Sequence, residues 1–112
     1  MSMDFSRRLS VALALLLGSA SASGLAADLT AAKAKAKMCA ACHGIDGIAT
    51  VADAPNLAGN GELYLARKLQ AFRSGECKHP QMSVIASGLS DEDIAAVTAW
   101  YSAIKVSVEL PE

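Results

Sequence analysis

The sequence predicts a small all-α domain that is rich in loops. Of its 112 residues 23 are alanine, whereas aromatic residues make up only 4%. Alanine has the highest helix propensity, and the runs of β-branched residues that favour a sandwich or a barrel are few. Apolar residues recur at helical spacing in separate stretches, which are divided by segments rich in glycine and proline. A chain of this length is expected to form one domain, which excludes a large multi-domain enzyme.

The first 27 residues are expected to be a signal peptide rather than part of the folded domain. Arg7-Arg8 form a basic start, a short apolar run follows at 11–17, and small residues lead to Ala27. This order is typical of a secretory signal; cleavage after Ala22 also fits, but cleavage after Ala27 is preferred. An uncleaved membrane anchor is the alternative, but seven strongly apolar residues fall well short of the ~20 that span a bilayer. We therefore expect export from the cytoplasm and a mature domain at 28–112.

The mature domain lacks the charge pattern of a protein that binds nucleic acid or a membrane surface. Six Lys and two Arg stand against five Asp and five Glu, a net charge of −2. The domain has no basic stripe, no cationic amphipathic helix and no further apolar segment long enough to span a membrane. At this size an ordinary core gives marginal stability, so an additional stabilising element is expected.

The first helix is expected at about 29–42, a stretch dominated by alanine and lysine. Asp28 or Thr30 would be a suitable N-cap, because its side-chain oxygen can accept hydrogen bonds from unpaired N–H groups. Three lysines fall on one side of this helix: Lys33, Lys35 and Lys37. We interpret them as a solvated face, with a docking patch for a partner protein as the alternative.

The second helix is expected at 62–74, where one buried stripe is formed by Leu65, Leu69 and Phe72. Gly75 follows at the position where a left-handed residue commonly ends a helix. The segments 44–61 and 76–88, which flank this helix, are expected to be loops because they contain glycine and proline.

The third helix is expected at 90–104, and its start is strongly marked. Ser90 is a typical N-cap, and three acidic residues follow it in the first turn, where the helix dipole favours negative charge. Leu89 and Ile94 have the spacing of a hydrophobic staple across this N-terminus. The apolar face of the helix is then formed by Ile94, Val97, Tyr101 and Ile104.

The chemistry-bearing motif is Cys39-Ala-Ala-Cys42-His43, which has the pattern C-x-x-C-H. Two thiols three residues apart near a helix end can add to both vinyl groups of one porphyrin, and His43 can then coordinate the iron. A signal peptide upstream is consistent with haem attachment outside the cytoplasm. A covalently bound haem would also supply the apolar core that the chain lacks.

These residues and their surroundings resemble the small bacterial class I cytochromes c over nearly all of the mature chain. The similar segments are the C-x-x-C-H-G motif at 39–44, Asp46-Gly47, Pro55–Gly59, Tyr64-Leu65, Lys68-Leu69, Phe72–Gly75, Met82 and the closing helix Leu89–Val97 with Trp100-Tyr101. The resemblance implies three or more helices and loops wrapped around one haem c, which is bound covalently through Cys39 and Cys42. It also implies that the first and last helices cross beside the haem, and that the carbonyl of Pro55 accepts the Nδ1–H of His43.

Two residues compete for the position opposite His43 on the iron. Met82 is the one methionine that remains after Met1 and Met3 leave with the signal peptide and Met38 is excluded as too close to the motif. It lies in the segment that resembles the distal loop of the family, and His/Met ligation suits an electron carrier of raised potential. His79 would instead give bis-histidine ligation, but its neighbours in the loop suggest an exposed side chain. We predict His43 and Met82 as the axial ligands.

Three other site chemistries are less favoured. A structural zinc site could be built from Cys39, Cys42, Cys77 and His79, but His43 would then have no role. A thioredoxin-like C-x-x-C pair needs a βαβ setting that the sequence lacks. A gas-binding haem needs an open or weakly held sixth position.

The resemblance implies a periplasmic one-electron carrier that exchanges electrons with donor and acceptor proteins. The sequence shows no paired carboxylates, nucleophile–base pair or phosphate loop, so we expect no enzymatic activity of its own. The alternative role is a haem c subunit docked to a catalytic oxidoreductase. Cys77 lies outside the motif: it is either a tolerated, partly buried small residue or a thiol that links covalently to a partner.

Overall fold

The computed structural model describes residues 23–112, with side chains described from Leu29 onward, so most of the expected signal peptide at 1–27 lies outside the described residues. Five helices form this part of the chain: α1 Ser23–Ala36, α2 Ala40–His43, α3 Glu62–Ser74, α4 Met82–Ser87 and α5 Asp91–Ala103. Between residues 23 and 112 there is no strand, so the all-α prediction is confirmed. None of these helices is long and apolar enough to cross a membrane.

The N-terminal helical region differs from the single helix expected at 29–42. α1 already begins at Ser23, so the proposed N-cap residues Asp28 and Thr30 lie inside it. It ends at Ala36, where the Cys39 N–H bonds to the Ala36 carbonyl at 2.9 Å, three residues back instead of four. Such a bond tightens the chain into a turn, after which α2 starts with a new direction. The motif is therefore carried on a separate short helix.

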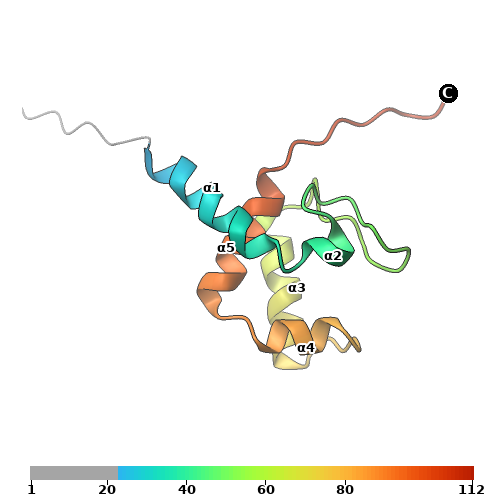
Figure 1. Ribbon diagram of the computed structural model, residues 1–112. Helices are drawn as coiled ribbons and strands as arrows, with labels where there is room; N and C mark the ends of the chain where they lie inside the picture. The colour runs from blue at the N-terminus through green and yellow to red at the C-terminus, as the bar shows by residue number, and fades with distance from the viewer. Residues whose placement is uncertain (1–22) are drawn as a thin grey trace, which may run out of the picture.

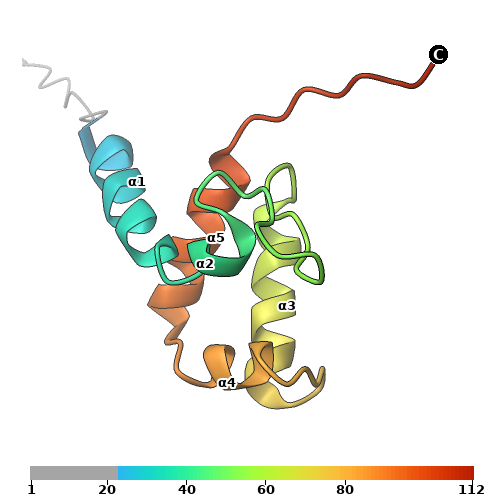
Figure 2. The ribbon, with the colours of Figure 1, turned by 45° about the vertical axis from the view of Figure 1, so that its right-hand side comes forward.

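α1 and α5 pack against each other, and α3 packs against α5 and α4 (Figures 1 and 2). The buried cluster consists of Ala36 from α1, Leu65 from α3, and Val97 and Tyr101 from α5. Ala36 and Tyr101 are both fully buried, so a small side chain on α1 faces a large one on α5. The alanines of α1 thus allow the close helix approach in which the core is built.

The lysines of α1 contact α5 rather than forming only a solvated face. The Lys35 ammonium pairs with the Asp93 carboxylate at 2.6 Å, and the Lys33 Nζ lies 5.2 Å from the centre of the Trp100 ring. Lys37 is exposed. Both contacts join α1 to α5 at the surface of their shared core.

The two later helices follow the sequence closely. α3 has the expected bounds, and Gly75 ends it with a left-handed φ of 82°. α5 starts after Ser90, whose side chain accepts from the Asp93 N–H while the Asp93 carboxylate accepts from the Ser90 N–H. Leu89 and Ile94, the residues of the expected staple, are both buried. These helices were predictable because their caps and apolar stripes are local in sequence.

α4 lies in a segment that was expected to be a loop, and this expectation was wrong for residues 82–87. The segment is too short for helical periodicity to be read, and its N-cap residue, Gln81, makes no side-chain cap bond. α4 packs on α3 and buries Ala86 completely. A helix this short is not stable alone, so its packing on α3 contributes to its formation.

Candidate functional site

The C-x-x-C-H motif occupies α2 and the residue before it. Cys39 is the N-cap of α2, Cys42 lies within it, and His43 is its last residue. The His43 side chain is only 8% exposed, and its Nδ1 lies 2.9 Å from the carbonyl oxygen of Pro55. Because a carbonyl oxygen can only accept, Nδ1 must carry the hydrogen, which leaves the Nε2 lone pair free to bind a metal.

The loop after α2 is built to bring Pro55 to His43. Gly44 and Gly47 both have positive φ, 71° and 74°, and reverse the chain directly after the motif. The Gly47 carbonyl accepts from the Leu57 N–H at 2.8 Å, and the Asn56 Oδ1 accepts from the Ala49 N–H at 2.8 Å. Each of these bonds joins a residue before Pro55 to a residue after it, so the loop is closed around the proline. The proline carbonyl is thus held in place by the rest of the loop.

α2 and the residues after it are also held by hydrogen bonds from Thr50 in the following loop and from Trp100 in α5. The Thr50 hydroxyl donates to the Ala41 carbonyl at 2.6 Å, and the Thr50 N–H donates to the Cys42 carbonyl at 2.9 Å. The Trp100 indole N–H donates to the carbonyl of Ile45 at 2.8 Å. The motif is consequently anchored to its own loop and to α5.

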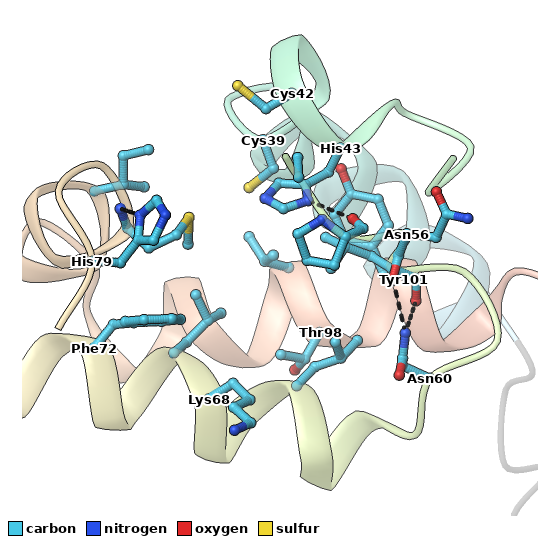
Figure 3. A pocket seen from close by; sticks show the side chains of 18 of the residues that line it. Cys39, Cys42, His43, Asn56, Asn60, Lys68, Phe72, His79, Thr98 and Tyr101 are labelled. Atoms are coloured by element: carbon cyan, nitrogen blue, oxygen red, sulfur yellow. Dashed lines mark hydrogen bonds between the residues drawn. The ribbon is translucent and has the colours of Figure 1, made fainter. Parts of the chain in front are cut away.

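Cys39, Cys42 and His43 line one cavity of about 390 Å³ together with Met82 and His79. Figure 3 shows His43 entering this cavity from the α2 side and His79 from the opposite side, with Phe72 of α3 beside His79. Much of the wall is apolar and includes Leu57, Leu65, Leu69, Phe72, Ile85 and Val97. The predicted site residues, although far apart in sequence, therefore meet in one largely apolar space.

His79 is half-buried, not exposed as its sequence neighbours suggested. Its ring lies edge-on to Phe72, with 6.3 Å between the ring centres. Its Nδ1 is 3.2 Å from the N–H groups of both Gln81 and Met82. From the sequence His79 is recognisable as a rival ligand but not as a half-buried residue, because neither the short α4 nor its packing on α3 could be read locally.

The three cysteines have different surroundings. None of them is in a disulfide. Burial raises the pKa of the Cys39 thiol above its ordinary value. Cys77 is half-buried and does not line the cavity; its N–H bonds to the carbonyl of Ala71 at 3.0 Å. Only Cys39 and Cys42 are thus placed where they could hold a group inside the cavity.

The zinc and thioredoxin-like alternatives find no support in this arrangement. Among residues 23–112 no cluster of three or more His, Cys, Asp or Glu side chains is close enough to hold a metal ion, so the zinc ligand set is not assembled. The same part of the chain contains no strand, and a thioredoxin-like βαβ unit is absent from it.

The residues of the cavity fit a covalently bound porphyrin. Two thiols and an imidazole with a free Nε2 lone pair stand at one end, and a thioether stands in the same space. The hydroxyls of Tyr101 and Thr98, which also line it, already donate to the carbonyls of Gly44 and Ile94. No buried side-chain N or O atom of the described residues lacks a partner, so the walls suit an apolar macrocycle.

Comparison with known proteins points to the same chemistry. A family model described as cytochrome c matches residues 30–104. Cytochrome c4 of Pseudomonas aeruginosa is 36% identical over 105 residues, which cover 94% of this chain and 52% of that protein. Cytochrome c-554(548) of Halomonas halodenitrificans is 42% identical over 80 residues, 69% of this chain and 96% of that protein. The chain thus spans about half the length of the cytochrome c4 relatives.

A further similar protein is named for its redox partner. The "thiosulfate dehydrogenase electron acceptor" of Stutzerimonas stutzeri is 43% identical over 70 residues, which cover 62% of this chain and 32% of that protein.

Proposed function

We propose a detailed function from one premise: the chain belongs to the cytochrome c family. It is an electron carrier with covalently bound haem c and not a catalyst. To this we add the roles of individual residues. Cys39 and Cys42 form the thioether bonds, His43 and Met82 are the axial ligands of the iron, and the Pro55 carbonyl orients His43.

One observation carries the proposal: the 2.9 Å contact between His43 Nδ1 and the Pro55 carbonyl. A hydrogen bond at Nδ1 fixes the ring orientation and makes Nε2 a stronger electron donor to a metal. The buried setting of His43 protects this bond from competition by water. An unused core histidine would gain nothing from having its second nitrogen left free toward a cavity.

Met82 is supported as the second ligand by its place in the fold. Among the described residues only two methionines line the cavity, Met38 and Met82. Met38 directly precedes Cys39 and is half-exposed, whereas Met82 starts α4, on the segment that also presents His79 to the cavity. A thioether ligand suits a carrier of raised potential.

When bound, the haem iron supplies a one-electron couple between its ferric and ferrous states. The chain's own residues hold that couple in a dry, preorganised setting. His43 and Met82 would keep the coordination the same in both states, and the apolar walls from α3 and α5 exclude water.

The proposed location and partners go beyond the haem site. We expect the protein to be exported through the signal peptide at 1–27 and to function in the periplasm. The leading role is a diffusing shuttle between donor and acceptor proteins, and the alternative is a haem subunit of an oxidoreductase. The name of the Stutzerimonas relative favours a dehydrogenase as the class of donor. A covalent partner bound through Cys77 is part of the subunit alternative.

The experiment that tests the ligands compares Met82→Ala with its matched control, Met38→Ala. The exported protein should be red, its haem should resist acid–acetone extraction, and Cys39→Ser and Cys42→Ser should each lose one thioether bond. In the ferric state a sulfur-to-iron charge-transfer band should be present, should disappear in Met82→Ala and should persist in Met38→Ala. A native haem that is high-spin and binds carbon monoxide would contradict the proposal and favour the gas-binding alternative.

Co-purification separates the two roles. A lone monomer in native extracts supports the shuttle, and a stoichiometric partner supports the subunit. If the partner is held by a disulfide, a non-reducing gel should show an adduct that is lost in Cys77→Ser.

A further inference from the structure

α4 begins without one of the residues that usually cap a helix. Gln81 stands at its N-cap, but the Gln81 side chain makes no cap bond. The first N–H groups of any helix lack partners within the helix, and leaving them unpaired in a half-buried setting destabilises the segment. In α4 these groups belong to the turn that carries Met82.

His79 supplies the missing acceptors. Its Nδ1 accepts from the Gln81 N–H and the Met82 N–H, each at 3.2 Å. The His79 N–H donates to the Ser83 hydroxyl at 3.0 Å, and the Ser83 N–H donates back to the His79 carbonyl at 3.1 Å. Four hydrogen bonds thus connect His79 with the three residues 81–83. Met82 is at the centre of this set.

The ring of His79 is oriented by more than these bonds. Phe72 of α3 meets it edge to face, with 71° between the ring planes. Figure 3 shows the His79 ring beside Phe72, on the side of the cavity opposite His43. The His79 ring therefore contacts α3 on one side and the backbone at the start of α4 on the other, so it links the two helices.

The two histidines of the cavity have opposite hydrogen-bond arrangements. At His43 the partner of Nδ1 is a carbonyl, so Nδ1 carries the hydrogen and Nε2 keeps a lone pair. At His79 the partners of Nδ1 are two N–H groups, so a neutral ring carries its hydrogen on Nε2. A ring nitrogen that carries a hydrogen has no lone pair for iron. His79 could become a ligand through Nε2 only by giving up both backbone bonds.

We infer that His79 is a positioning residue for Met82: it caps α4 through Nδ1 and thereby holds the Met82 backbone at the cavity, while it does not itself bind the iron. This inference rests on the proposed ligation by His43 and Met82. It assigns His79 a role that neither a surface side chain nor a sixth ligand would have.

Two substitutions separate capping from ligation. Asparagine places Oδ1 at the same distance along the side chain as Nδ1 of histidine, and it is a good N-cap residue, so His79→Asn keeps the acceptor. Glutamine places its polar atoms near the position of Nε2 and removes the acceptor at Nδ1, so His79→Gln loses the cap. Lys78→Ala, at the exposed neighbouring position, is the control for changes in the same loop.

The readout is the affinity of the ferric holoprotein for added imidazole, which must displace Met82. His79→Gln should raise this affinity roughly five- to tenfold, the factor that corresponds to a lost helix cap of typical strength. His79→Asn and Lys78→Ala should stay within about twofold of the unsubstituted protein. The charge-transfer band should weaken in His79→Gln and remain in His79→Asn, and haem content checks that each variant has folded.

The results that would overturn the inference are distinct from those that overturn the ligand assignment. If the band depends on Met82 but His79→Gln binds imidazole no better than Lys78→Ala, the capping role fails alone. The role also fails if His79→Asn behaves like His79→Gln. If the low-spin spectrum survives Met82→Ala and is lost in both His79 variants, His79 is the ligand, and the proposed ligation fails together with the inference.

Discussion

The Tyr101 hydroxyl donates a hydrogen bond to the carbonyl oxygen of Gly44 at 2.9 Å, across 57 positions of sequence. Gly44 directly follows His43, and the same hydroxyl lies 3.5 Å from the carbonyl of Ala36, where α1 ends. Tyr101 is fully buried. One side chain of the last helix therefore joins both ends of the turn and helix that carry the haem-binding motif.

Tyr101→Phe should lower the free energy of unfolding by about 0.5–1.5 kcal/mol, because the buried Gly44 carbonyl loses one of its two donors and keeps only the Gly47 N–H. Denaturant unfolding of the holoprotein measures this change. Tyr64→Phe is the matched control, since the Tyr64 side chain is 53% exposed and should tolerate loss of its hydroxyl. Equal effects of the two substitutions would show that the Gly44 bond is not stabilising.

The same tyrosine should make the protein sensitive to alkali. Burial, above all, raises the pKa of Tyr101 to about 12, whereas the unfolded chain has a value near 10. The contribution is complete below the unfolded value, and it is lost as the pH rises from about 10 to about 12, by on the order of 2 kcal/mol. Unfolding free energies measured across this range should fall more steeply in the unsubstituted protein than in Tyr101→Phe. Parallel curves would contradict the assignment.

Gly44→Ala should be far more damaging than Gly75→Ala, although both glycines have positive φ. At Gly44 a Cβ would collide with the carbonyl oxygen of Ile48, and at Gly75 it would meet nothing within 4 Å. We expect a loss of about 1 kcal/mol at Gly75 from backbone strain and at least about 3 kcal/mol at Gly44. Thermal unfolding measures both, and the yield of haem-loaded protein should drop only for Gly44→Ala, because His43 is its neighbour.

Lys35→Ala should raise the pKa of Asp93. The Lys35 ammonium at 2.6 Å is the main cause that holds the pKa of this carboxyl below its usual value. A lowered pKa means that the contact stabilises the fold above the unfolded value and ceases to do so as the pH falls through the folded value. An NMR titration of Asp93 gives the shift directly. Lys37→Ala, at an exposed lysine with no ion pair among the described residues, should leave the titration unchanged.

The features that could be predicted from the sequence depend on neighbours along the chain. The cap of α5 at Ser90 and the left-handed Gly75 after α3 are decided within a few residues. The C-x-x-C-H motif is local in the same sense, because two thiols and an imidazole on one short segment are already close together. For these elements, composition and spacing contain the physical cause of the structure.

The first helix shows where such reasoning stops. Alanine and lysine favour a helix throughout 29–42, yet the chain turns after Ala36 and restarts at Ala40. The Tyr101 hydroxyl lies near the Ala36 carbonyl, and Thr50 bonds to carbonyls of α2, so residues distant in sequence contact both sides of the break. Helix propensity carries no information about those distant partners.

By itself, then, the sequence determined the all-α class, the caps of α3 and α5 and the thiol–imidazole chemistry of residues 39–43. Only the tertiary structure decided that Pro55 meets His43 and that α4 packs on α3, whereas the bonds from His79 to residues 81 and 82 are local but carry no recognisable sequence signature. The Pro55–His43 contact depends on hydrogen bonds that close the loop after α2. A helix of six residues has too few internal hydrogen bonds to be stable alone, so α4 depends on its packing against α3 as well as on the His79 cap.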